Sequence, residues 1–326
     1  MPAKNQVFVS PKEEEQKQAI NSLKSRVFGS GLKYHIVTYG CQMNVHDSEK
    51  LAGMLSEIGY EETGDPQEAD LILFNTCCVR ENAELRVYGN IGALKSYKKA
   101  DPSRILGVCG CMMQQTEVSD DIVRKFPFVD LVFGTHNLHR FPSLLLRAMD
   151  SGRTIVEIPH SEGEVIEHLP VKRASGVSAW VTIMHGCNNF CSYCIVPYVR
   201  GRERSRRPED ILEEITKLAE EGYPEITLLG QNVNSYGKDL DDPCLFPALL
   251  REIDKINGIE RIRFMTSHPK DLSDDLILAM AGCVGVCEHL HLPVQAGSDR
   301  ILRAMNRKYS RESYLKLVDK VRQAVP

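Results

Sequence analysis

Three cysteines close together in the sequence constrain this chain more than any other feature. Cys187, Cys191 and Cys194 form a C-x3-C-x2-C pattern, which begins just after the apolar, strand-like stretch 180–184 and the strand-breaking Gly186. A [4Fe–4S] cluster has four irons, and three thiolates can hold one iron each, which leaves one iron open for another ligand. A structural zinc site would need four protein ligands. The pattern therefore favours an iron–sulfur cluster after a strand, with buried or zinc-bound cysteines as the alternative.

The composition is that of an ordinary globular protein. The 326 residues suggest about two domains, when roughly 150 residues are taken for each. The net charge of −4 excludes a general basic field for nucleic acid, but it leaves room for a local basic patch. The 11 cysteines are too few for a disulfide scaffold in a chain of this length, and no secretory or membrane-spanning apolar run is present. We therefore expect a cytoplasmic protein, away from membranes, whose thiols bind metal.

The first half of the chain alternates between short apolar runs and helical patterns. Residues 1–32 are polar and predict a flexible N-terminal arm, with one helix over about 11–28. Residues 33–150 form the first predicted domain. Its strands are expected at 34–39, 71–75, 104–108 and 129–134, and its helices at 46–58, 82–98, 119–125 and 138–149. This alternation predicts an α/β fold with a doubly wound, Rossmann-like parallel sheet.

A second alternation follows a polar stretch at 151–175, which we interpret as a linker. In residues 176–326, strands are expected at 179–184, 225–230, 260–266 and 288–293, and helices at 208–222, 244–256, 271–281 and 310–324. This is the repeat of a β/α barrel. Four strands do not close a barrel, and the chain stops at Pro326 just after a helix. The sequence therefore predicts an incomplete barrel and a fragment of a longer protein.

Three cysteines of the first domain each follow a different predicted strand. Cys41, Cys77 and Cys111 come after the first, second and third strand. In a parallel sheet the carboxyl ends of the strands meet at one edge, where ligands bind, so these side chains can converge. Three converging thiolates again match a cluster with one open iron. The alternative is that they only pack in the core, because free cysteine is often buried.

Several longer segments strengthen this interpretation. The chain closely resembles the methylthiotransferase branch of the radical S-adenosylmethionine (SAM) enzymes and, within it, the MiaB-type tRNA methylthiotransferases. The resemblance covers roughly residues 33–326 and is carried by the segments Thr38–Asn44, Asn75–Cys77, Val79–Glu84, Gly110–Met112, Thr266–Leu272 and His291–Arg300. Relatives also carry a C-terminal RNA-binding TRAM domain, which this sequence lacks.

The resemblance implies a function and a set of cofactors. It implies transfer of a methylthio group to carbon-2 of an N6-isopentenyladenosine beside the anticodon, with two SAM molecules and two [4Fe–4S] clusters. By position, Cys41, Cys77 and Cys111 would hold an auxiliary cluster, and Cys187, Cys191 and Cys194 the cluster that cleaves SAM. The implied partners are tRNA, a sulfur source and an electron donor such as flavodoxin or ferredoxin, and a monomer is expected.

Further residues are candidates for contacts with SAM or RNA. Polar residues at strand ends are expected to bind SAM or the base, with plain turns as the alternative, and Tyr193 is expected to pack on the adenine of SAM. The expected SAM-binding residues are Tyr193, Gln231, Asn232, Ser267, Gln295 and Ser298. A basic patch follows the loop that carries Cys187, Cys191 and Cys194, the cysteine loop. This patch is expected to bind RNA phosphates, although it could hold the SAM carboxylate or face solvent. The patch consists of Arg200, Arg202, Arg204, Arg206 and Arg207.

The remaining cysteines have no matching role. Cys78 and Cys109 lie beside expected ligands, and Cys78 is expected to point to the side opposite Cys77. Cys244, Cys283 and Cys287 are expected to pack in the core. No catalytic residue is assigned beyond the cluster ligands. Two alternative functions remain: methylthiolation of another tRNA adenosine or a ribosomal protein, and a non-catalytic iron–sulfur module that binds RNA or transfers electrons.

Overall fold

The protein consists of two compact units. The computed structural model describes residues 11–78, 81–159, 163–173 and 176–325. The first unit comprises Met1–Ser161 with His168–Lys172, and the second comprises Glu162–Glu167 with Arg173–Pro326. The described residues of 151–175, the stretch predicted as a linker, divide between the two units.

The first unit is built on a six-stranded sheet in the order β2-β1-β3-β4-β5-β6, with all neighbouring strands parallel. Every residue of the central strands β3 and β4 is buried, because helices cover both faces of the sheet. The strands are β1 (Lys33–Thr38), β2 (Glu61–Glu62), β3 (Leu71–Thr76), β4 (Ile105–Gly110), β5 (Leu131–Phe133) and β6 (Ile155–Glu157). The predicted doubly wound sheet is confirmed, with β2 and β6 as additional edge strands.

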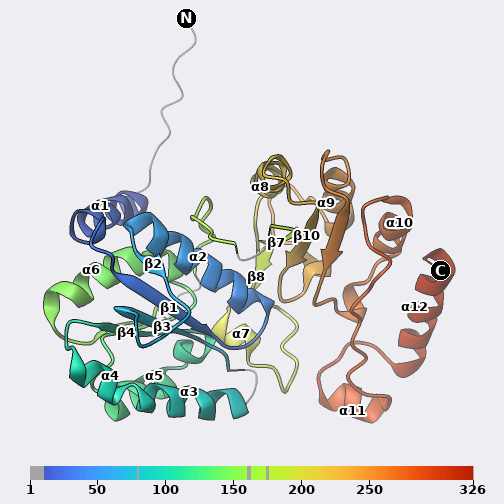
Figure 1. Ribbon diagram of the computed structural model, residues 1–326. Coiled ribbons are helices and arrows are strands. Elements are labelled where there is room, and N and C mark those ends of the chain that lie inside the picture. The colour runs from blue at the N-terminus through green and yellow to red at the C-terminus, as the bar shows by residue number, and fades with distance from the viewer. Residues whose placement is uncertain (1–10, 79–80, 160–162, 174–175, 326) are drawn as a thin grey trace, which may run out of the picture. The chain divides into compact units, whose positions relative to one another are not determined.

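Two hydrophobic cores lie on the two faces of this sheet (Figure 1). One face carries α1 (Pro11–Val27), α2 (Gln42–Ile58) and α6 (Phe141–Ser151). The other carries α3 (Glu81–Ala93), α4 (Lys95–Ala100) and α5 (Thr116–Lys125). The helix predicted over 82–98 is thus two helices, which meet at Leu94.

The polar composition of residues 1–32 predicts a flexible arm, but within the described residues α1 is a packed helix. Ala19, Leu23 and Val27 are buried. They recur every fourth residue, so they share one helix face, which packs on the core despite the polar residues around them. Within the predicted linker, Ile155–Glu157 form β6, which joins the sheet beside β5.

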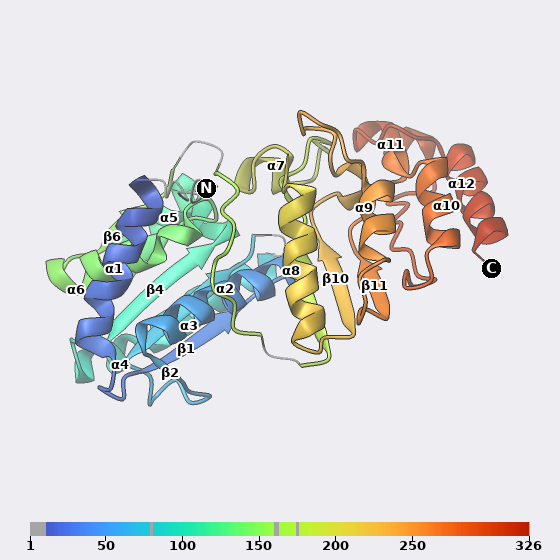
Figure 2. The same cartoon turned by 90° about the horizontal axis from the view of Figure 1, so that it is seen from above.

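The second unit carries a smaller parallel sheet in the order β11-β10-β7, formed by β7 (Ser178–Thr182), β10 (Glu225–Leu229) and β11 (Arg261–Phe264). The crossover helices α8 (Pro208–Glu220) and α9 (Phe246–Ile253) cover the sheet, and α10 (Asp274–Gly282) packs beside α9 (Figure 2). A hairpin of β8 (Met184–His185) and β9 (Arg204–Ser205) and the short helix α7 (Val196–Val199) follow β7. The predicted β/α repeat of a partial barrel is confirmed.

One predicted strand of the second unit does not form. Residues 288–293 are irregular, and α11 (Asp299–Ala304) and α12 (Arg311–Ala324) follow them. Pro293 has no N–H for a ladder. The carbonyls of Leu292 and Val294 accept hydrogen bonds from the hydroxyls of Tyr314 and Tyr309, at 2.8 Å each. These carbonyls bind side chains in place of a neighbouring strand.

The structure also bears on the expected lack of a membrane segment. No helix in the described ranges combines the length and apolar character that a membrane span requires.

Candidate functional site

The cysteine loop of the second unit follows β7 and β8 and is fixed at its start by backbone contacts. Gly186 has φ +77°, and a Cβ there would lie 1.9 Å from the carbonyl oxygen of Arg202, so only glycine fits. Its N–H donates to Oε1 of Gln231, which follows β10. The N–H of Cys187 donates to the carbonyl of Gly201 at 3.1 Å. Gln231, expected to bind SAM, thus supports the loop that carries the thiols.

The three thiols of this loop lie close to one another in a sheltered position. Cys187 and Cys191 are buried and Cys194 is half-buried. Burial raises the pKa of Cys187 to about 11 and also raises the pKa of Cys194, so without metal both thiols stay protonated at pH 7. Iron binding must therefore release protons. In the described ranges, no three Cys, His, Asp or Glu side chains are placed to hold one metal ion, whereas a four-iron cluster takes one thiolate for each iron.

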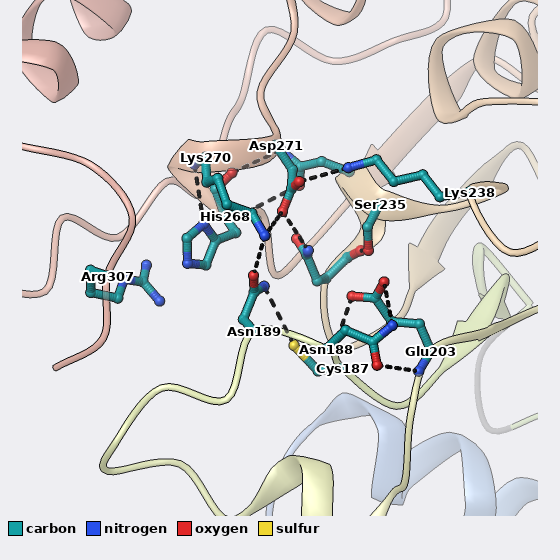
Figure 3. A network of polar contacts seen from close by, with 12 residues as sticks. Cys187, Asn188, Asn189, Glu203, Ser235, Lys238, His268, Lys270, Asp271 and Arg307 are labelled. Atoms are coloured by element: carbon teal, nitrogen blue, oxygen red, sulfur yellow. Dashed lines mark hydrogen bonds and ion pairs between the residues drawn. The ribbon is translucent and has the colours of Figure 1, made fainter.

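A polar network joins the cysteine loop to the ends of β10 and β11 (Figure 3). Asn189 donates from Nδ2 to the sulfur of Cys187 at 3.5 Å and accepts a 2.7 Å hydrogen bond from Lys270. Asp271 accepts from Lys238 at 2.6 Å and from Asn232 at 2.9 Å. Burial alone would raise the pKa of Asp271, but these two hydrogen bonds outweigh it and hold the pKa below its ordinary value.

His268 belongs to the same network and is neutral at pH 7. It is buried, and burial together with the charge of Arg307 lowers its pKa to about 4. Its Nδ1 accepts from the backbone N–H of Lys270 at 3.1 Å, so the ring proton lies on Nε2. The imidazole can therefore donate a hydrogen bond but does not act as a cation.

Two buried polar atoms at these strand ends have no hydrogen-bond partner in the described part of the chain: Asn232 Oδ1 and Ser267 Oγ. A buried polar atom left unpaired costs about 1–3 kcal/mol, so such atoms mark places where a ligand is expected. The neighbouring Thr266 has φ +66°, a left-handed conformation that is strained for a β-branched residue. An amino or hydroxyl group, as SAM carries, can donate to Asn232 Oδ1, and the Ser267 hydroxyl can donate to a carboxylate or accept from an amino group.

The other expected SAM-binding residues are more exposed. Tyr193 in the cysteine loop is 52% exposed, so its ring is open to a ligand. Gln295 is exposed and has φ +67°. Ser298 is exposed at the start of α11, and its side chain makes no capping bond. None of these three side chains makes a hydrogen bond to Asn232 Oδ1 or Ser267 Oγ.

A turn after α11 holds the cysteine loop from the other side, a contact that no sequence pattern predicts. Ser192 donates from its backbone N–H to the carbonyl of Met305 at 3.2 Å and from its hydroxyl to the carbonyl of Ala304 at 2.9 Å. Asn306 donates to the carbonyl of Phe190 at 2.8 Å. Arg307 donates from Nη1 to the sulfur of Cys191 at 3.3 Å. The loop is therefore shaped by residues more than a hundred positions away.

The arginine patch divides into buried and exposed members. Arg200 and Arg206 are buried, Arg204 is half-buried, and Arg202 and Arg207 are exposed. Arg206 forms ion pairs with Glu167 and Glu214 and donates to the carbonyl of Thr182 at 2.7 Å. The sequence predicts that Arg206 contacts RNA, but its charge is paired with two carboxylates inside the second unit. Burial also makes Arg200 unsuitable for a phosphate, which leaves Arg202 and Arg207 as the accessible cations.

The carboxyl edge of the first sheet brings its cysteines together. Cys41 is the exposed N-cap of α2, whereas Cys77 and Cys111, after β3 and β4, are buried. A Cβ on Gly40 would lie 2.7 Å from the sulfur of Cys77, so the turn before Cys41 passes directly over that thiol. The dipole at the N-terminus of α2 adds positive potential next to the thiols.

Asn44 organises this edge, although the sequence marked it only as part of a motif. Its Nδ2 donates to the carbonyls of Tyr39 and Thr76 at 2.8 and 2.9 Å, so one side chain ties the ends of β1 and β3. Its Oδ1 accepts from the Cys111 thiol at 3.6 Å.

Strand alternation predicts that Cys78 points to the side opposite Cys77. The Cys78 thiol instead lies beside the thiol of Cys111. A hydrogen bond with Cys111 and burial raise the pKa of the Cys78 thiol. β3 ends at Thr76, so the alternation no longer applies at Cys78. Cys109 is buried within β4, and Cys244 and Cys283 pack against the core of the second unit, as expected of packing residues.

Comparisons with known proteins agree with both halves of this description. Residues 33–134 match the Uncharacterized protein family UPF0004, and residues 181–326 match the Radical SAM superfamily. The chain is 58% identical to the tRNA-2-methylthio-N(6)-dimethylallyladenosine synthase of Acetivibrio thermocellus, an alignment that covers 98% of the chain and 68% of that protein. It is 62% identical to the synthase of the same name from Caldicellulosiruptor saccharolyticus, covering 91% of the chain and 63% of that protein.

The fold also resembles a solved structure. The radical S-adenosylmethionine methyltransferase TsrM from Kitasatospora setae superposes with a TM-score of 0.61 at 15% identity, covering 90% of the chain and 66% of that protein. At this identity the similarity concerns the fold alone. The chain spans about two thirds of the length of the two synthases to which it was compared.

Proposed function

The chain belongs to the tRNA-2-methylthio-N(6)-dimethylallyladenosine synthase family of radical SAM enzymes, and from this membership we propose that it transfers a methylthio group to carbon-2 of an N6-isopentenyladenosine beside the anticodon of tRNA. The observation that carries the proposal is the 58% identity over 98% of the chain with a synthase of that name. A base in the anticodon loop is single-stranded, so it can be splayed out into a protein site.

We further propose that two [4Fe–4S] clusters serve this reaction. Cys187, Cys191 and Cys194 would hold one, and Cys41, Cys77 and Cys111 the other, with three thiolates each and one open iron. When bound, these groups would supply the electron that cleaves one SAM into a radical able to take hydrogen from carbon-2, and a sulfur that a second SAM methylates. The protein supplies position, electrostatics and exclusion of water.

The residues of the second unit have separate roles in this proposal. Gln231 and the Gly201 carbonyl fix the start of the cysteine loop, and Lys270 fixes Asn189 within it. Asn232 Oδ1 and Ser267 Oγ are the unpaired polar atoms that would bind the polar groups of SAM. Neutral His268 adds a hydrogen-bond donor without a further positive charge.

The partners remain part of the proposal. Arg202 and Arg207 are the exposed arginines for contacts with tRNA phosphates. A small electron carrier such as flavodoxin or ferredoxin would deliver the electron, and a sulfur source would renew the sulfur at the auxiliary site. We propose a monomer that works in the cytoplasm.

The nucleosides of tRNA provide the direct test. A strain that lacks its own methylthio synthase is complemented with the full-length gene, and its tRNA is digested and analysed by mass spectrometry. We expect the isopentenyl nucleoside to gain a methylthio group with the wild-type gene and not with Cys191→Ala. Unmodified isopentenyl nucleoside in the wild-type complement would refute the assigned substrate.

The use of two SAM molecules is tested by stoichiometry in vitro. Each methylthio group formed should be accompanied by one 5′-deoxyadenosine and one S-adenosylhomocysteine, because one SAM is cleaved and the other donates its methyl group. Product formed without S-adenosylhomocysteine would contradict a second SAM as the methyl donor.

A further inference from the structure

Arg307 is a buried cation without a carboxylate partner in the described part of the chain. Its side chain is 7% exposed. Nε donates to the hydroxyl of Tyr309 at 3.0 Å, Nη2 lies 3.5 Å from the carbonyl of Pro293, and the guanidinium stacks over the Tyr309 ring at 5.2 Å. All of these partners are neutral, so none of them compensates the charge.

The remaining contact of Arg307 is with a thiol of the cysteine loop. Nη1 lies 3.3 Å from the sulfur of Cys191. The positive charge also favours the deprotonated form of the Cys194 thiol and opposes protonation of His268. Arg307 thus lies next to thiols that become negatively charged when they bind iron.

Energetics favour an anion at this place. Burying an uncompensated charge is unfavourable, and the neutral contacts of Arg307 offset this cost only in part. Among the contacts of Arg307, the Cys191 sulfur is the group that becomes an anion when the loop binds iron. A guanidinium that donates to a thiolate makes a charge-assisted hydrogen bond, stronger than the neutral bonds that the iron-free protein offers.

We propose that Arg307 is the counter-cation of the centre formed by Cys187, Cys191 and Cys194, and that it raises the reduction potential of the cluster held there by a hydrogen bond to the Cys191 sulfur. Hydrogen bonds to cluster sulfurs and nearby charge are among the features that set such potentials. A reduced cluster carries one more negative charge, so a fixed cation stabilises it relative to the oxidised form. Arg307 acts through Cys191 and is a positioning residue. The inference rests on the proposed function, because it requires a cluster at these thiols.

The test compares variants of Arg307 in a chain with a single cluster. Cys41, Cys77 and Cys111 are replaced by Ala in the full-length protein, which is reconstituted anaerobically with iron and sulfide. The midpoint potential is measured by spectroelectrochemistry for Arg307→Gln, which removes the charge, and for Arg307→Lys, which keeps it. Arg303→Gln is the matched control, because Arg303 is an exposed arginine of the same segment.

For Arg307→Gln we expect a reduced-to-oxidised ratio about tenfold lower at a fixed potential, which is a shift of about 59 mV to more negative values for a one-electron couple. Arg307→Lys should lie between Gln and the wild type, and Arg303→Gln should match the wild type. An unchanged potential in Arg307→Gln overturns the proposal. An unchanged potential with weaker SAM binding also overturns it, and assigns Arg307 to the SAM carboxylate.

Two other outcomes separate this inference from the proposed function. If the background variant with intact Arg307 binds no iron, the assignment of Cys187, Cys191 and Cys194 fails, and the proposed function fails with it. If only Arg307→Gln fails to take up iron, Arg307→Lys decides the question. The proposal expects iron uptake to return with the lysine charge. Absence of iron in the lysine variant overturns it and leaves Arg307 a purely structural part of the turn.

Discussion

Arg206 donates hydrogen bonds from Nε to both carboxylate oxygens of Glu167, each at 2.9 Å. The sequence predicts Arg206 in a patch that grips RNA and Glu167 in a linker, and this one contact accounts for both differences. Glu214 completes the arrangement with a 2.7 Å bond to Nη1. The segment that contains Glu167 is thereby attached to α8 and β7 of the second unit.

Loss of this buried ion triad should destabilise the second unit. We expect Arg206→Ala to lower the free energy of unfolding by about 3–5 kcal/mol, because Glu167 would lose its ion pair while half-buried and Glu214 would keep only Arg173. Denaturant unfolding measures this change. The exposed Arg207→Ala should change stability by less than about 0.5 kcal/mol, and equal effects of the two variants would contradict the structural role of Arg206.

Binding of tRNA should depend on the exposed members of the patch. If Arg202 and Arg207 contact phosphates, each substitution by Gln should reduce the slope of log affinity against log salt by about 0.7–0.9. The measurement is tRNA binding across a salt series with the full-length protein. Arg322→Gln, an exposed arginine on α12, serves as control. Unchanged slopes for both arginines would remove them from the RNA surface.

The iron content tests the number of clusters. Anaerobically reconstituted protein should bind about eight irons, as two cubanes of four. Replacing Cys187, Cys191 and Cys194 with Ala should leave about four, and replacing Cys41, Cys77 and Cys111 should leave the other four. A matched control is Cys244→Ala, which should keep all eight because Cys244 packs against the core. Wild-type protein with only four irons would contradict the two-cluster proposal.

The two sets of cysteines should differ in what their loss abolishes. Without Cys187, Cys191 and Cys194, no 5′-deoxyadenosine should form, because the loop of these thiols is linked through Asn189, Lys270 and Asp271 to Asn232, whose Oδ1 is unpaired. Without the auxiliary thiols, cleavage of SAM should continue while methylthio transfer stops. Both products are quantified by liquid chromatography. Methylthiolated product from the auxiliary variant would show that sulfur delivery lies elsewhere.

His268 should make the iron-free protein less stable in mild acid. Its pKa is lowered to about 4 in the folded state, below the ordinary value of 6.5, so the unfolded chain binds the proton more readily. The contribution is fully present above pH 6.5 and is lost as the pH falls from 6.5 towards 4. We expect a loss on the order of 1–2 kcal/mol, after allowance for the solvent near the ring. Anaerobic denaturant unfolding at several pH values should show this loss, and His268→Gln should flatten it.

The features that the sequence predicts well are local in the chain. The cysteine loop after a strand requires Gly186, which stands next to Cys187, and the β/α alternation depends on apolar runs a few residues long. The convergence of Cys77 and Cys111 follows from parallel topology alone. The same topology places Asn44 at this edge, because Asn44 lies in the first turn of α2, whose N-cap is Cys41.

The features that the sequence misses depend on distant partners. Arg307 contacts Cys191 across 116 positions, and no spacing rule connects them. Arg206 cannot be distinguished from Arg207 by sequence, since only Glu167 and Glu214 decide which arginine is buried. The helix predicted over about 11–28 is present as α1, but the sequence does not predict its packing, because its apolar face consists of a few residues within a charged segment.

The turn after α11 is synthesised later than the cysteine loop that it contacts. Ser192 and its partner Ala304 are 112 positions apart, so at about 5–20 residues per second the cysteine loop is synthesised roughly 6–20 s before the residues that clamp it. During that interval its thiols are present on the nascent chain without Asn306 and Arg307 to shape the loop. We therefore expect iron to enter only after residue 307 has left the ribosome, so cluster insertion follows the synthesis of Cys194 by several seconds at least.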